Sequence, residues 1–315
     1  MTKIVYLDQN KWIDLARAFY DREDGQKFKD TLSFLQDKVE KNEIIIPISV
    51  VHLIETAKNA NKDKRERLAN FIASLSKGYG IVSYLNVRDL EIENAILKRI
   101  GKPLKHDISK STIGKGLSYT VGLDIEGLFQ SDGLDKLREQ INLNPVFAAR
   151  FMIDLIDRDE VKKIVEDIED ISGFEKEREE KLGLYSKEMR LRIGISEMAV
   201  SLILPLVIKQ LNRMNIEPKE FADDFKNIDD WKNFFFSMPT LDIWINLHTL
   251  RDNDKSKPIH RNDLKDIGFL SIAIPYCDLV VTENYWANML KTNKFDKKYN
   301  CEIITDINQL KEIIK

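Results

Sequence analysis

The feature that most constrains the fold is a short apolar run followed at once by polar residues and a helical pattern. The first example is Ile4–Leu7, which runs into Asp8 and then into a helix expected over Lys11–Tyr20. A brief run of β-prone residues bounded by polar ones is typical of a buried strand. Strands that alternate with helices predict a parallel sheet covered on both faces. The pattern therefore indicates an α/β protein.

The same alternation continues to about residue 85 and returns near residue 240. Further strands are expected over Glu43–Ile48, Tyr79–Leu85, Asp278–Thr282 and Glu302–Ile304, and further helices over Lys27–Lys41, Lys62–Ser76, Asp266–Ile274 and Asn308–Lys315. Residues 86–239 instead show one helical pattern after another, a stretch too long for an ordinary loop. We expect one discontinuous domain from residues 1–85 and 240–315, interrupted by a helical insertion of residues 86–239.

Composition excludes several classes of protein. The 49 Lys and Arg nearly balance the 52 Asp and Glu, so nucleic-acid binding would require a local basic patch. Cys277 and Cys301 lack metal-ligand spacing, which favours reduced thiols. The N-terminus lacks the plan of a signal peptide. Ala199–Ile208 is short and contains a proline, whereas a span needs about 20 residues, so we expect a kinked core helix, a cytoplasmic protein and no membrane partner.

Acidic residues follow three of the expected strands, either near the carboxyl end of the strand or in the helix just after it: Asp8, Glu55 and Glu283. A fourth, Asp266, is expected in the first turn of the helix that precedes Asp278–Thr282. Parallel strands bring their carboxyl ends to one edge of the sheet. Clustered carboxylates repel one another unless a cation neutralises them, and oxygen ligands favour Mg²⁺ or Mn²⁺. The alternative for Asp8 or Asn10 is a simple helix cap.

Three stretches carry a resemblance to a known family. They are YLDQN at Tyr6–Asn10, IIIPISVVHLIETAK at Ile44–Lys58, and NDLKDIGFLSIAIPYCDLVVTENYW at Asn262–Trp286. In order and spacing, these stretches resemble the PIN domain nucleases. The resemblance implies a three-layer PIN-like fold with a central parallel sheet, and endonucleolytic hydrolysis of phosphodiester bonds, most often in RNA. It implies metal-binding and catalytic roles for Asp8, Glu55, Asp266 and Glu283, with Asn10 and Thr282 supporting them through hydrogen bonds.

Two ligand assignments stay open at this point. The usual final Asp of the family would fall at Asn284, so Glu283 beside it departs from the pattern. Asp278 is an alternative to Glu283 as the last ligand, because it is an aspartate. It begins its strand, however, and so belongs to the edge of the sheet opposite Asp8. Asp263 lies one helical turn before Asp266 and is either a helix cap or a ligand.

A nuclease must also bind a polyanion, and two stretches are locally basic. Lys98–Lys115 carries six Lys or Arg against one Asp, and Lys255–Lys265 directly precedes Asp266. Phosphate contacts from such groups provide affinity without sequence specificity, whereas solvated surface is the alternative interpretation. The candidate nucleic-acid-binding residues are Lys102, Lys105, Lys255, Lys257, His260 and Arg261. Trp286 is expected in the core, or beside the site, where it would stack on a base.

The expected function is a metal-dependent endonuclease, with RNA more strongly indicated than DNA. A toxin or phage-defence effector is the expected setting, and the partners considered are a protein regulator or antitoxin and a second copy of the chain. The alternative is a catalytically inactive PIN-like module that binds nucleic acid or protein. A nucleotide-binding protein is disfavoured because no Gly-rich turn follows the first strand.

Overall fold

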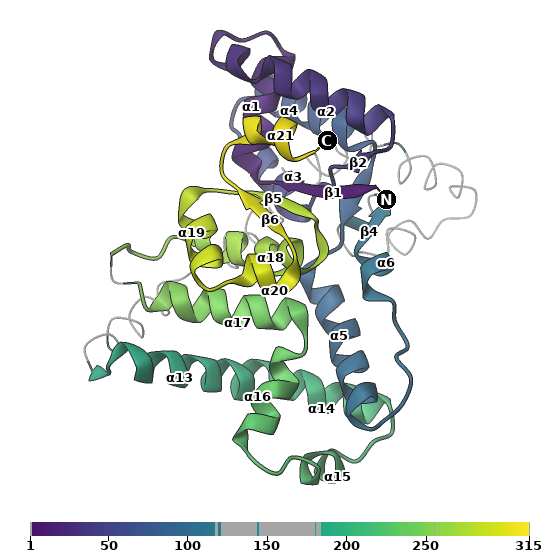
Figure 1. Cartoon of the computed structure of the whole chain (residues 1–315), viewed down its shortest axis with the longest axis vertical. Coiled ribbons are helices and arrows are strands. Elements are labelled where there is room, and N and C mark those ends of the chain that lie inside the picture. Colours follow the sequence, from purple (N-terminus) through teal and green to yellow (C-terminus); the bar gives the residue numbers. More distant parts are fainter. Residues whose placement is uncertain are drawn as a thin grey trace. The chain divides into compact units, whose positions relative to one another are not determined.

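The computed structural model describes residues 2–116, 119–120, 144, 180, 184–254 and 256–314. The described residues divide into two compact units (Figure 1). The first unit draws on Met1–Ser83, Thr112–Glu166 and Ala273–Lys315, and the second on Tyr84–Ser111 and Asp167–Ile272. The chain thus leaves the first unit after Ser83, returns to it over Thr112–Glu166 and rejoins it at Ala273. The sequence pattern instead places a single interruption over residues 86–239.

A four-stranded parallel sheet forms the centre of the first unit. Its strands, in spatial order, are β2 (Ile44–Ile45), β1 (Lys3–Leu7), β5 (Leu279–Val281) and β6 (Glu302–Ile304). In the register of this sheet, Ile4 lies opposite Ile45 and Leu7 lies opposite Val281. The prediction of an α/β protein with a central parallel sheet is confirmed.

Both faces of the sheet are buried, which explains why its strands are continuous apolar runs. Side chains alternate between faces along a strand, so Val5 and Leu7 share one face and Tyr6 points to the other. Leu7 and Val281 pack into a core with Trp12, Leu35 and Phe71. The helices that contribute to this core include α1 (Gln9–Phe19), α2 (Lys29–Glu40), α3 (Val50–Ala57) and α4 (Lys62–Ser76).

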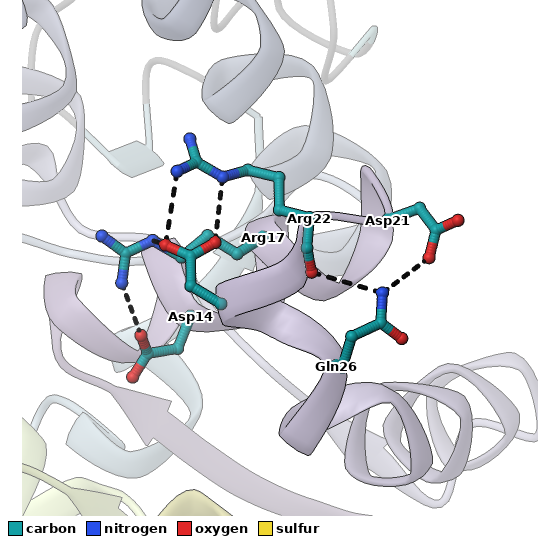
Figure 2. Close-up of polar contacts among 6 residues, drawn as sticks. Asp14, Arg17, Asp21, Arg22 and Gln26 are labelled. Atoms are coloured by element: carbon teal, nitrogen blue, oxygen red, sulfur yellow. Dashed lines mark hydrogen bonds and ion pairs between the residues drawn. The ribbon is translucent and has the colours of Figure 1, made fainter.

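The connection from α1 to α2 is a 3-10 helix, η1 (Glu23–Phe28), held close against α1. Figure 2 shows its polar contacts, in which Arg17 pairs with Asp14 at 3.1 Å and Gln26 donates to Asp21 at 2.9 Å. Ion pairs and hydrogen bonds at or near the surface contribute little stability. Gly25 matters more, because a Cβ atom there would stand 2.3 Å from the backbone carbon of Arg17.

A second, two-stranded antiparallel sheet pairs β3 (Tyr79–Ile81) with β4 (Ile113–Lys115). A parallel bridge joins Ile48 to Gly80 beside it. The predicted strand Tyr79–Leu85 is too long, because a helix begins at Tyr84. The predicted strand Glu43–Ile48 is also shortened, since Pro47 has no N–H to give to a ladder. β4 lies within the stretch expected to be wholly helical.

The second unit is helical throughout its described part. Its core includes Ile92 and Ile96 from α5, together with Phe234, Leu241 and Ile245. Leu241 and Ile245 belong to α17, which explains why this helix groups with the second unit. The helices are α5 (Tyr84–Arg99), α13 (Lys187–Glu197), α14 (Leu204–Arg213), α15 (Pro218–Asp223), α16 (Ile228–Phe236) and α17 (Pro239–Asp252).

The remaining elements follow the expected order. Helix α6 (Ile108–Thr112) leads into β4, and α18 (Arg261–Tyr276) runs from the second unit into the first. After β5 come α19 (Asn284–Thr292) and α20 (Phe295–Tyr299), and after β6 come η3 (Ile307–Gln309) and α21 (Leu310–Ile313).

The apolar stretch around Pro205 lies in one continuous helical segment, Lys187–Arg213. Its middle part is a π-helix, η2 (Met198–Ile203), which ends two residues before Pro205. The missing N–H of Pro205 removes a helical hydrogen bond. Ile203 and Val207 enter the core of the second unit. Among the described residues, this is the one helix whose length and composition would suffice to cross a membrane. Within its most apolar stretch of 18 residues, 17% is buried.

Candidate active site

The carboxyl edge of the central sheet brings together residues from both ends of the chain. The N–H of Asp8 donates to the carbonyl of Val281 at 2.9 Å, which continues the pairing of β1 with β5. Thr282 and Glu283 follow Val281, so they leave the sheet at the same edge as Asp8. Asp8 is also the N-cap of α1, and its carboxylate accepts from the N–H of Gln9 at 2.6 Å. The capping role and the strand-end position therefore belong to one residue.

The negative charges of two other predicted ligands affect the pKa of Asp8. Its side chain is buried, with 5% of the residue exposed. Burial, helped by the negative charges of Glu283 and Glu55, raises the pKa of Asp8 to about 7 against the lowering effect of the Gln9 N–H and Lys11. Asp8, Glu55 on α3 and Glu283 before α19 thus form one interacting group of acids within the first unit.

Asn10 holds one of these acids in place. Its Nδ2 donates to Oε1 of Glu283 at 2.7 Å, and both residues are exposed. Thr282, the other predicted supporting residue, is fully buried, and its N–H donates to Ile304 at 3.0 Å. Its hydroxyl has no hydrogen-bond partner among the described residues, and a buried polar group without a partner calls for an explanation.

Gln9 is a residue that the sequence pattern did not single out. It is 7% exposed, and its Nε2 donates to Oγ1 of Thr56 at 3.1 Å. Its Oε1 is buried and has no partner within the described parts of the chain. The sequence offers one weak signal, an amide side chain directly after the strand-end acid. The partner lies 47 positions away, so only the fold reveals it.

Tyr6, Ser49 and His52 form a buried network on the other side of β1. The Tyr6 hydroxyl lies 3.2 Å from Oγ of Ser49 and 3.2 Å from Nε2 of His52. The N–H of Ser49 donates to Nδ1 of His52 at 3.0 Å, which places the ring proton of a neutral imidazole on Nε2. Burial lowers the pKa of His52 to about 3, so this histidine is a neutral packing residue at pH 7.

The two aspartates of α18 have different positions. The helix begins at Arg261, so Asp263 lies in its first turn, and the expectation that Asp266 lies there is wrong. Oδ2 of Asp263 accepts from Nε of Arg251 and from the N–H of His260, each at 2.8 Å. Asp263 is therefore committed to an ion pair with a buried arginine. Asp266 belongs to the second unit, so the first unit by itself assembles Asp8, Glu55 and Glu283.

Asp278 lies at the amino edge of the sheet. Its Oδ2 accepts from the N–H of Ile4 at 2.7 Å, and its own N–H donates to the carbonyl of Ile4 at 3.0 Å. Ile4 and Asp8 are at opposite ends of β1. The geometry therefore favours Glu283 over Asp278 as the companion of Asp8.

The predicted nucleic-acid-binding residues are distributed over the second unit. Lys102, Lys105, Lys257 and His260 are exposed, while Lys255 and the side chain of Arg261 lie outside the described part. Lys105 pairs with Glu93 at 2.8 Å, which reduces its availability to a phosphate. Trp286 is 1% exposed, so the alternative that it stacks on a base is wrong.

The carboxylates of Asp8, Glu55 and Glu283 are oxygen ligands of the kind that a hard cation prefers. Their side chains, however, do not point to one common position. Across the described residues, no three His, Cys, Asp or Glu side chains stand close enough together to hold a metal ion. Glu55 and Glu283 have long side chains whose rotation can move their carboxylates without a change of backbone. Comparison of the chain with protein-family models, with curated proteins and with solved structures finds no match.

Proposed function

We propose that the protein is a metal-dependent endonuclease with a PIN-like fold, acting most readily on RNA. The observation that carries the proposal is the buried carboxylate of Asp8 at the carboxyl end of β1, whose pKa the negative charges of Glu283 and Glu55 help to raise. The parallel order β2-β1-β5-β6 supports the fold, because it brings the two blocks of the resemblance together as neighbouring strands.

In this proposal Asp8, Glu55 and Glu283 hold one or two Mg²⁺ or Mn²⁺ ions. Such an ion polarises a phosphodiester and lowers the pKa of a bound water. The chain's own residues set the donors in place. Asn10 binds one oxygen of Glu283 and leaves the other oxygen for a cation. The Gln9 N–H holds one oxygen of Asp8 in the same way.

The biological setting rests on the resemblance alone. We propose a cytoplasmic effector, either a toxin or an antiviral defence protein, whose activity a protein regulator restrains. The exposed basic residues Lys102, Lys257 and His260 would contribute phosphate contacts without sequence specificity.

The test compares two Asp→Asn variants of the full-length chain. Wild type, Asp8→Asn and Asp278→Asn are incubated with single-stranded and structured RNA and DNA, in Mn²⁺, Mg²⁺ or EDTA. Asp278 is a matched control, because it lies at the opposite edge and an Asn oxygen can still accept from Ile4. We expect cleavage that needs metal and Asp8 and that survives Asp278→Asn.

The second candidate function is a PIN-like module that binds nucleic acid or protein without cutting. The unconverged acid side chains of the described residues favour it. If no cleavage is seen and calorimetry finds no Mn²⁺ binding that depends on Asp8, the binding module replaces the nuclease as the proposed function.

A further inference from the structure

We infer that Gln9 is a positioning residue that sets the separation of the Asp8 and Glu55 carboxylates. The inference rests on the proposed metal site, because it assigns Gln9 a role in the affinity of that site for a divalent cation. Gln9 acts through its side-chain hydrogen bond to Thr56, the residue after Glu55, so it is not itself a ligand.

The first step is the contact between the two elements that carry the acids. Gln9 directly follows Asp8 at the start of α1, and Thr56 directly follows Glu55 near the end of α3. The hydrogen bond from Gln9 Nε2 to Thr56 Oγ1 spans 3.1 Å and is buried. A side-chain bond between the two residues that succeed the acids ties the end of β1 to the helix bearing Glu55.

The second step concerns one buried polar atom of Gln9 that has no hydrogen-bond partner among the described residues. Oε1 of Gln9 is buried without a partner among the described residues. An apolar side chain of similar size would fill the position without that desolvation penalty. The amide of Gln9 therefore costs the folded protein stability. Such a local conflict between a side chain and its surroundings is expected at functional sites.

The third step is that three consecutive residues, Asp8, Gln9 and Asn10, connect the three predicted ligands of the first unit. Asp8 supplies one carboxylate, Gln9 reaches the α3 residue beside Glu55, and Asn10 bonds to Glu283 at 2.7 Å. The first turn of α1 therefore connects to both α3 and the start of α19. Substitution of a residue that orients the metal ligands without binding the metal itself commonly changes the metal affinity by about 10- to 100-fold.

The test measures the dissociation constant of Mn²⁺ by calorimetry on the full-length chain, with denaturant unfolding in parallel. The variants are Gln9→Leu, Thr56→Val and Thr56→Ser, of which the last keeps the hydroxyl. Thr31→Val is the matched control, because Thr31 is a buried threonine of the same unit whose hydroxyl donates to Asn308 at 2.6 Å, away from the acids.

We expect Gln9→Leu and Thr56→Val each to weaken Mn²⁺ binding about tenfold, with Thr56→Ser close to wild type. Thr31→Val should lower stability and leave the Mn²⁺ affinity within about twofold. Should Gln9→Leu fail to fold, the nearly isosteric Thr56→Val decides the question.

Two different failures can be told apart. Wild-type Mn²⁺ binding that depends on Asp8, combined with unchanged affinity in Thr56→Val, would overturn the role of Gln9 and leave the proposed function standing. A wild type that shows no Mn²⁺ binding dependent on Asp8 would overturn the metal site and the role of Gln9 together.

Discussion

The side chain of Asn10 donates to Glu283 across 2.7 Å, joining two residues that are 273 positions apart in the chain. One lies in the first turn of the first helix and the other caps α19. This bond connects the two terminal blocks at the edge where Asp8 leaves the sheet. It explains how residues from opposite ends of the sequence form one group of acids.

Asn10→Ala should weaken Mn²⁺ binding and slow cleavage about tenfold, because Glu283 loses the donor that holds one of its oxygens. The variant should keep its fold, since both side chains are exposed. Asn293→Ala is the control at the other end of α19, where Nδ2 of Asn293 donates to the carbonyl of Met289 at 2.8 Å. Equal Mn²⁺ affinities for the two variants would show that the Asn10 bond is incidental.

Asp8→Asn should stabilise the metal-free protein at neutral pH. The pKa of Asp8 is about 7 in the folded state against 3.8 for an ordinary Asp, so the folded state binds the proton more tightly. Its contribution to stability is fully present below about pH 4 and is lost as the pH rises to about 7, by on the order of 4 kcal/mol. The measurement is the free energy of unfolding of wild type and variant from pH 4 to 8 in EDTA.

The variant's advantage in that experiment should grow between about pH 4 and 7 and then level off. The comparison between two proteins is necessary because His52, whose folded pKa is about 3, changes the stability of both in the opposite direction. A difference that stays constant across this range would contradict the raised pKa of Asp8.

Gly25→Ala should destabilise the first unit by about 1–3 kcal/mol, the usual cost of overpacking. A Cβ atom at Gly25 would meet the backbone of Arg17 at 2.3 Å and that of Ala18 at 2.4 Å. Gly268→Ala is the matched control, because its Cβ would meet Tyr84 at 3.6 Å, an ordinary contact. Thermal unfolding that shows equal effects for both substitutions would refute the close approach at Gly25.

Asp263→Leu should destabilise the second unit by about 3–5 kcal/mol, because it removes the carboxylate that pairs with the buried guanidinium of Arg251. The double variant Arg251→Met with Asp263→Leu should recover much of that loss. Denaturant unfolding of the single and double variants gives the coupling between the two residues.

The milder Asp263→Asn separates this structural role from metal binding. It should leave Mn²⁺ affinity unchanged, because Asp263 is committed to Arg251 in the structure. Loss of Mn²⁺ binding in a folded Asp263→Asn protein would instead make Asp263 a ligand.

The sequence by itself determined the α/β class, the helix Lys62–Ser76, the strand Glu302–Ile304 and the placement of Asp8 and Glu283 near strand ends. These features depend on local periodicity, capping and β-propensity, which neighbouring residues express without help from the rest of the chain. Tertiary structure decided the features that need distant partners. β4 forms because it pairs with β3, and Asp263 becomes structural because Arg251 lies beside it. Gln9 acquires its role only when the parallel sheet and α3 bring Thr56 within hydrogen-bonding distance.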